Sequence, residues 1–129
     1  MVVAFMLKVR WEINPDKLAD FRLNQRALCK AMLEHPGVIT YHAEYPSPLV
    51  SDWIEIYAND EAFRAHLANE KGKGPLSAVT AACDRITVRC FGNPDAESRA
   101  FLAGANTSYH DTAPEAFVLN PRADRDSPV

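Results

Sequence analysis

The order of alternating and helical segments over the first ninety or so residues constrains the fold of this chain more than any other feature. Residues 2–13 alternate between apolar and polar side chains, which is typical of a strand with one buried face. Asn14 and Pro15 then begin a helix, as N-cap and first helical residue, and the helix ends at His35-Pro36-Gly37. Between them, apolar residues recur at helical spacing: Leu18, Phe21, Leu28 and Met32.

The next segments predict a hairpin, a second helix and a fourth strand. Residues 38–45 and 52–58 are rich in β-branched and aromatic side chains and are joined by Pro46-Ser47-Pro48, which predicts a hairpin. Asn59 or Asp60 caps a second helix, whose buried side carries Ala62, Phe63, His66 and Leu67. We expect residues 71–75 to break this helix, a further turn or two over 76–83, and a fourth strand over 85–91.

This order predicts an α+β fold of ferredoxin-like type, a split βαβ (βαββαβ) with a four-stranded antiparallel sheet. We assign residues 1–92 to this domain and residues 93–129 to a C-terminal extension. The extension is expected to contain a short helix near 96–103, a strand over 116–119 and a frayed tail over 120–129.

Composition indicates the class of protein and the kinds of partner that it can bind. The chain has 129 residues, 47% hydrophobic and 24% charged, with a formal net charge of −3, as expected for one ordinary globular domain. The basic residues are scattered, which argues against nucleic acid or a membrane surface as partner. Lys8 and Arg10 interrupt the apolar N-terminal run, so we expect no signal peptide or membrane span. Three widely separated cysteines argue against disulfides and a zinc site, and favour the cytoplasm.

The second face of the sheet also requires a partner, because two helices cover only one face of a four-stranded sheet. Aromatic and charged side chains mixed on one surface suit a protein interface better than water. We therefore expect a homodimer packed sheet to sheet. Alternation places on this face Lys8, Arg10, Glu12, Thr40, His42, Glu44, Trp53, Glu55, Tyr57, Arg89 and Phe91.

The element order, the helix pattern Glu61-Ala62-Phe63-x-x-His66-Leu67 and the expected sheet-on-sheet dimer resemble the dimeric α/β-barrel superfamily, in particular the antibiotic biosynthesis monooxygenase family. The resemblance covers residues 2–91. It implies a dimeric α/β barrel and an activity like that of quinol monooxygenases, which are cofactor-independent. Relatives in this superfamily also include anthrone oxygenases and proteins that degrade haem.

The resemblance also assigns positions. The helix histidine of the quinol-oxygenase type corresponds to His66, and a tryptophan that often ends the third strand corresponds to Tyr57. The family's further histidine after the helix break has no counterpart in residues 72–76, and the first-strand asparagine of haem degraders has none in residues 8–10. We therefore expect no haem, no metal and no other cofactor.

His66 is the candidate catalytic residue. A histidine of ordinary pKa, near 6.5, can remove a proton from a phenol or hydroquinone held in a pocket. The resulting anion can itself pass an electron to O2, with no flavin or metal. The alternative is a core histidine whose ring is bonded to a backbone carbonyl.

Two further groups are candidates for the site. Tyr41, Tyr57, Phe63 and Trp53 form an expected aromatic wall for substrate, with plain core or interface packing as the alternative. His42 and Glu44 share one strand face, and Glu55 and Arg89 can join them from other strands. We interpret these four as a buried salt-bridge network at the dimer interface in preference to an acid/base pair. Gly72 and Gly74 indicate a helix break, or else a mobile lip over the pocket.

The leading hypothesis for function is a cofactor-independent monooxygenase that uses O2 on a small aromatic quinol or polyketide-like phenol. An isomerase or lyase of the same superfamily would use the same base without oxygen. A non-catalytic ligand-binding or assembly module is the third hypothesis, because fold does not fix function.

Overall fold

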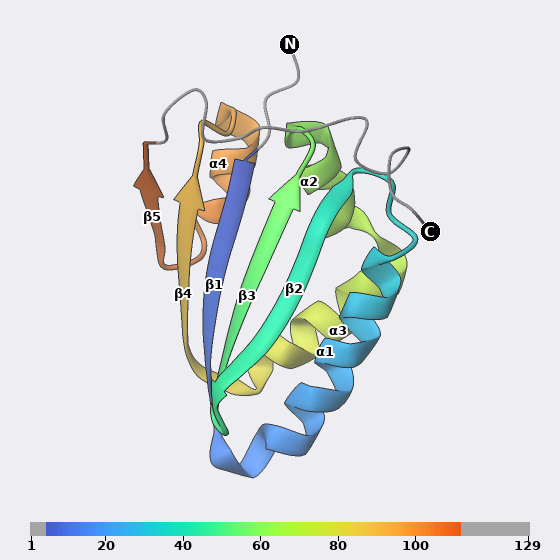
Figure 1. The fold of residues 1–129 in the computed structure, drawn as a ribbon, viewed down its shortest axis with the longest axis vertical. Helices are drawn as coiled ribbons and strands as arrows, with labels where there is room; N and C mark the ends of the chain where they lie inside the picture. The colour runs from blue at the N-terminus through green and yellow to red at the C-terminus, as the bar shows by residue number, and fades with distance from the viewer. Residues whose placement is uncertain (1–4, 112–129) are drawn as a thin grey trace, which may run out of the picture.

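A five-stranded sheet carries helices on one of its faces, as Figure 1 shows for the computed structural model, which describes residues 5–111. The strand order is β2-β3-β1-β4-β5, so β1 lies in the centre. The elements, in chain order, are β1 (Phe5–Ile13), a 3-10 turn (Pro15–Lys17), α1 (Leu18–Met32), β2 (Val38–Ser47), β3 (Val50–Tyr57), α2 (Asp60–Ala68), α3 (Glu70–Ala81), β4 (Cys83–Phe91), α4 (Ala96–Leu102) and β5 (Thr107–His110).

The first four strands pair antiparallel and confirm the predicted βαββαβ order. The prediction of a four-stranded antiparallel sheet is wrong, because β5 adds a fifth strand parallel to β4. A parallel neighbour needs a crossover connection, and α4, predicted from the sequence near 96–103, supplies it. The strand expected over 116–119 and the tail over 120–129 lie outside the described residues.

Side-chain caps set the helix starts where the sequence predicts them. The Asn14 side chain accepts a hydrogen bond from the Asp16 backbone N–H at 2.9 Å, and Pro15 follows as the first residue of the turn. The Asn59 side chain accepts one from the Ala62 N–H at 2.8 Å at the start of α2. Both asparagines satisfy backbone donors that the helix itself leaves unpaired.

The alternation of β1 places its apolar side chains in the core, as predicted. Its buried residues pack under the helices together with residues of α1 and α3. The helix-facing side chains of β1 are Phe5, Leu7, Val9, Trp11 and Ile13, each at most 6% exposed. Met6, Lys8, Arg10 and Glu12 point to the opposite, open face of the sheet.

The face predicted for β3 is wrong. Residues directly opposite each other in an antiparallel pair share a face, and β3 pairs Trp53 with Val9 and Glu55 with Leu7. Trp53, Glu55 and Tyr57 therefore lie under the helices and not on the open face. Alternation within β3 could not decide this, because the other face carries Ile54 and Ile56 and is also apolar.

The predicted helix break over residues 71–75 is also wrong. The chain breaks at Asn69, whose side chain caps α3 by accepting a hydrogen bond from the Lys71 N–H, and α3 then continues through Gly72, Gly74 and Pro75. Packing against α1 explains why a glycine is found inside this helix. A Cβ at Gly72 would lie 3.3 Å from Leu28 Cδ1, so glycine allows α3 to lie close against α1. The mobile-lip interpretation of this segment is therefore wrong as well.

We predict that Gly37→Ala lowers the free energy of unfolding by about 2–3 kcal/mol, the cost of overpacking a closed site. An added Cβ would overlap the Cβ of Ala62, and the Gly37 carbonyl already accepts a hydrogen bond from the Ala58 N–H at 3.0 Å, so the turn has little room to move. Urea unfolding measures the change. Gly104→Ala is the control, since its Cβ would meet nothing within 4 Å. Equal effects of the two substitutions would contradict this account.

Candidate active site

Helix α2 carries His66 on its buried side, as the sequence predicts. Ala62, Phe63 and His66 share one helix face at spacings of three and four residues, and His66 is 4% exposed. Its Nδ1 atom is buried and has no hydrogen-bond partner among the described residues. The alternative of a core histidine bonded to a backbone carbonyl therefore finds no support at this nitrogen.

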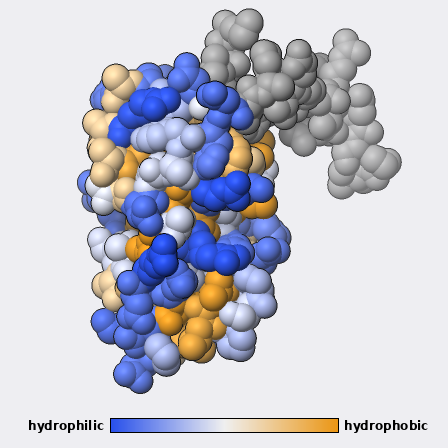
Figure 2. Space-filling view, turned by 90° about the vertical axis from the view of Figure 1, so that its left-hand side faces the viewer, coloured by the Kyte–Doolittle hydropathy of each residue, from blue (hydrophilic) through white to orange (hydrophobic). Residues whose placement is uncertain are grey.

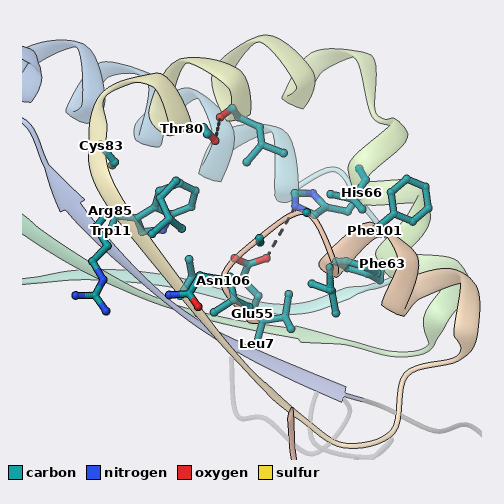
Figure 3. A pocket seen from close by; sticks show the side chains of 18 of the residues that line it. Leu7, Trp11, Glu55, Phe63, His66, Thr80, Cys83, Arg85, Phe101 and Asn106 are labelled. Atoms are coloured by element: carbon teal, nitrogen blue, oxygen red, sulfur yellow. Dashed lines mark hydrogen bonds and ion pairs between the residues drawn. The ribbon is translucent and has the colours of Figure 1, made fainter. Parts of the chain in front are cut away.

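Strand β3 brings a carboxyl group to the same place. Glu55 is 5% exposed, and its Oε1 lies 3.9 Å from His66 Nε2. The Tyr57 hydroxyl donates a hydrogen bond to this Oε1. Both Tyr41 and Tyr57 place their rings 5.6 Å from the His66 ring. Figure 3 shows the carboxyl group and the imidazole facing each other from the sheet and from α2.

Burial moves the pKa values of the two groups in opposite directions. Burial raises the pKa of Glu55 to about 7, against the hydrogen bond from Tyr57, which lowers it. Burial, with a smaller contribution from the nearby His35, lowers the pKa of His66 to about 4. Both shifts favour the uncharged forms. Between about pH 4 and about pH 7 both groups are therefore uncharged, and their contact at 3.9 Å is not an ion pair. Glu55 is the group whose charge changes near neutral pH.

A cavity of about 520 Å³ lies over these groups. Glu55, His66 and Tyr41 lie together in one part of it, called the polar end below, and apolar side chains from β1, α2, α3 and β4 form walls (Figure 3). Thr80, Asp84, Arg85 and Asn106 also line the cavity. This size is in the range of pockets for drug-sized ligands. The apolar lining includes Leu7, Val9, Phe63, Leu67, Leu76 and Val88.

The C-terminal extension forms part of the same cavity. Phe101 at the end of α4 and residues 104–106 of the α4–β5 loop line it. The Asn106 carbonyl accepts a hydrogen bond from the Val88 N–H at 2.8 Å, which holds the loop against β4. Phe101 is nevertheless 54% exposed. Figure 2, which views the β5 side of the molecule, shows hydrophobic residues exposed between hydrophilic ones on this surface.

The predicted aromatic wall divides into two parts. Tyr41 and Phe63 line the cavity with His66. Trp53 does not line it, because it is buried in the core, and its Nε1–H donates to Gln25 Oε1 at 2.9 Å. Tyr57 is also buried behind the cavity, where its hydroxyl contacts Glu55.

The predicted network of His42, Glu44, Glu55 and Arg89 does not form. Glu55 lies on the helix-covered face, whereas the other three lie on the open face, where His42 Nε2 is 3.8 Å from Glu44 Oε2. Arg89 is on β4, separated from β2 by β3 and β1, and its guanidinium lies 5.0 Å from the Phe91 ring centroid. The reason is again the face of β3, which the sequence pattern alone leaves undecided.

Sequence reasoning missed two contributions to the cavity. One is the contact between Glu55 and His66, which pairing of β3 with β1 would have indicated, since Glu55 lies opposite the buried Leu7. The other is the α4–β5 loop, for which the sequence carries no recognisable signal. Within residues 5–111, no group of three or more His, Cys, Asp or Glu side chains is placed to hold a metal ion. The described helices include none long and apolar enough to cross a membrane.

Comparison with known proteins adds the fold family. Compared as a sequence, the chain matches no family model and no curated protein. Solved structures do match. Two are provisionally named antibiotic biosynthesis monooxygenases. The one from Caulobacter crescentus is 17% identical with a TM-score of 0.62, over 73% of this chain and 92% of its own. The one from Bacteroides thetaiotaomicron is 22% identical with a TM-score of 0.60, over 66% of this chain and 84% of its own. MupZ from Pseudomonas fluorescens is 17% identical with a TM-score of 0.68, over 92% of this chain and 95% of its own.

The chain has the fold of the antibiotic biosynthesis monooxygenases. This confirms the fold predicted from the order of elements. At these identities the likeness establishes the fold alone. The chemistry of the site has to be argued from the residues of this chain.

We predict that the wild type loses stability relative to Glu55→Gln as the pH rises from about 5 to about 8. The pKa of Glu55 is about 7 in the folded protein against 4.5 for an ordinary glutamate, so the folded state binds more protons in this window. Ionisation of this one group therefore makes unfolding easier by about 3 kcal/mol in total. The lowered pKa of His66 changes stability in the opposite direction, but it does so in both proteins and cancels in the comparison. Urea unfolding of both proteins at several pH values measures the difference. A stability difference between the two proteins that does not change with pH would contradict the assigned shift.

Proposed function

We propose that this chain is a cofactor-independent monooxygenase that acts on a small aromatic quinol or polyketide-like phenol. The observation that carries the proposal is a buried carboxyl group with a pKa of about 7, placed beside a neutral histidine at the polar end of a cavity. Perturbed acids in clefts are typical of sites of proton transfer. The fold shared with proteins named antibiotic biosynthesis monooxygenases supports the reaction class.

Glu55 is the base in this proposal, and it replaces His66 in that role. With a pKa of about 4, His66 is a weak base at neutral pH and keeps a single ring N–H. Glu55 is ionised in about half of the molecules near pH 7 and accepts the proton of the substrate hydroxyl. The His66 Nε2–H, which faces the carboxyl group, then donates a hydrogen bond to the phenolate oxygen as negative charge forms on it.

The oxygen step needs only the substrate anion and O2. The anion passes one electron to O2, and the substrate radical and superoxide combine to form a carbon–oxygen bond. Glu55 returns its proton to the peroxide to give a hydroperoxide. The remaining C–H proton then leaves to Glu55 as the O–O bond breaks, and the departing hydroxide takes up this proton and leaves as water. For a substrate CH2 group next to the phenol system, one oxygen atom becomes the product carbonyl and the other becomes water, so that CH2 and O2 give C=O and H2O.

The walls of the cavity serve this chemistry by holding the ring and excluding water. Tyr41 and Phe63 offer aromatic surfaces next to the polar end, and Leu7, Leu67 and Val88 continue the apolar lining. An anion in such surroundings is less hydrated than in bulk water and is held in one orientation. Trp53 and Tyr57 support this wall from behind.

The proposal includes a homodimer packed through the open face of the sheet, in the cytoplasm. The open face carries the half-buried Ile54 and Ile56 beside Lys8 and Arg10, and has a hollow of about 660 Å³. Such a mixture of apolar and charged groups suits an interface between proteins. The three cysteines, Cys29, Cys83 and Cys90, are free thiols, which suits a reducing compartment.

We predict that the protein consumes O2 with anthrone or 1,4-naphthohydroquinone, and that the rate rises with pH through about 7 as Glu55 loses its proton. Glu55→Gln should lower the rate by about a hundredfold or more and abolish this rise, since glutamine accepts no proton. An oxygen electrode, corrected for spontaneous oxidation, measures the rate. Binding of the probe without O2 uptake would favour an isomerase, a lyase or a binding module and would contradict the oxygenase.

We predict that His66→Ala lowers the rate of O2 consumption by about a hundredfold, the scale of losing one donor to a developing anion. His42→Ala is the matched control, since its imidazole lies on the opposite face of the sheet and does not line the cavity. The control should retain the wild-type rate. Equal rates for the His66 variant and the wild type would remove His66 from the mechanism.

A further inference from the structure

Tyr57 contacts the proposed base without touching the cavity. Its hydroxyl donates a hydrogen bond to Glu55 Oε1, and this oxygen is also the carboxyl atom that lies 3.9 Å from His66 Nε2. Tyr57 itself is fully buried and is not among the lining residues. Any effect that it has on a ligand therefore passes through Glu55.

The packing around Tyr57 fixes the position of this hydroxyl. Its ring lies 5.6 Å from the ring of Phe5, 5.2 Å from that of Phe63 and 5.6 Å from that of His66, measured between centroids. Tyr57 and Glu55 are two residues apart on one strand and share its helix-covered face. The hydroxyl cannot move away from Oε1 without disturbing three neighbouring rings.

We propose that Tyr57 is a positioning residue, which holds Oε1 of Glu55 as a hydrogen-bond acceptor and so directs the proton of the substrate to Oε2. The inference rests on the function proposed above. An oxygen that already accepts a strong hydrogen bond is the poorer base of a carboxylate, so the incoming proton binds the other oxygen. The carboxyl group then delivers and receives its proton at one fixed atom.

The same hydrogen bond keeps the carboxyl group usable at neutral pH. The titratable groups that face Glu55 are Tyr41 from β2, Cys29 from α1, His66 from α2 and Tyr57 from its own strand. Burial raises the pKa values of Tyr41 and Cys29 and lowers that of His66, so these three groups are uncharged near pH 7. Burial also raises the pKa of Glu55, and the hydrogen bond from Tyr57 opposes that rise.

Tyr57→Phe tests the inference, with Tyr45→Phe as matched control. Each substitution removes one buried hydroxyl, but the Tyr45 hydroxyl has no hydrogen-bond partner among the described residues, and Tyr45 does not line the cavity. NMR titration of the ¹³C-labelled Glu55 carboxyl in substrate-free protein should show its pKa raised by about one to two units in Tyr57→Phe, the scale of losing one bond to a charged group. The pH midpoint of O2 consumption should rise by the same amount. Neither value should move in Tyr45→Phe.

A second variant guards against loss of folding in Tyr57→Phe. Fluorotyrosine at position 57 keeps the shape and makes the hydroxyl a stronger donor, so both midpoints should fall. Unchanged midpoints in the two position-57 variants, or an equal change in Tyr45→Phe, would overturn the role of Tyr57. Shifts of the carboxyl pKa as expected, in a protein that consumes no O2, would support the hydrogen bond as assigned and contradict the proposed oxygenase.

Discussion

The pairing of β3 with β1 places a carboxyl group beneath the helices, and the remainder of the site depends on this register. Because Glu55 lies opposite Leu7, it enters an apolar layer where an isolated charge is costly. The carboxyl group has one hydroxyl, from Tyr57, and one imidazole edge, from His66, close to it. A shift of the pairing by one residue would carry Glu55 to the open face and leave His66 over an apolar wall.

The helices position His66 and close the cavity over the sheet. The cap at Asn59 starts α2 so that His66 comes over β3. The close contact at Gly72 lets α3 pack against α1, and residues of α3 close one side of the cavity. At the other side, α4 and its loop continue the lining, and the Arg64 guanidinium of α2 holds both carboxylate oxygens of Asp95, the cap of α4, at 2.9 Å. The extension is thus tied to the helix that carries His66.

Local sequence signals predicted the parts of this structure that local interactions decide. The asparagine caps and the alternation of β1 are examples, because each depends on neighbours in the chain. The faces of β3 could not be predicted in this way, since Trp53 and Tyr57 on one side and Ile54 and Ile56 on the other are all apolar. Gly74 and Pro75 signal a break that helix packing overrides. Of the candidate site, His66, Tyr41 and Phe63 were placed correctly around one cavity. The contact of His66 with Glu55 was not predicted, because it joins α2 to β3 and depends on the register in which β3 pairs with β1.

The central claim is that Glu55 is a buried acid that changes charge near neutral pH at the polar end of the cavity. Infrared difference spectroscopy between low and high pH tests it directly, since a protonated carboxyl group has a C=O stretch that a carboxylate lacks. The account predicts one such band that disappears with a midpoint near pH 7 and is absent from Glu55→Gln. The account would be contradicted if every such band disappeared with a pH midpoint of about 4 to 4.5, the range of ordinary, exposed carboxyl groups.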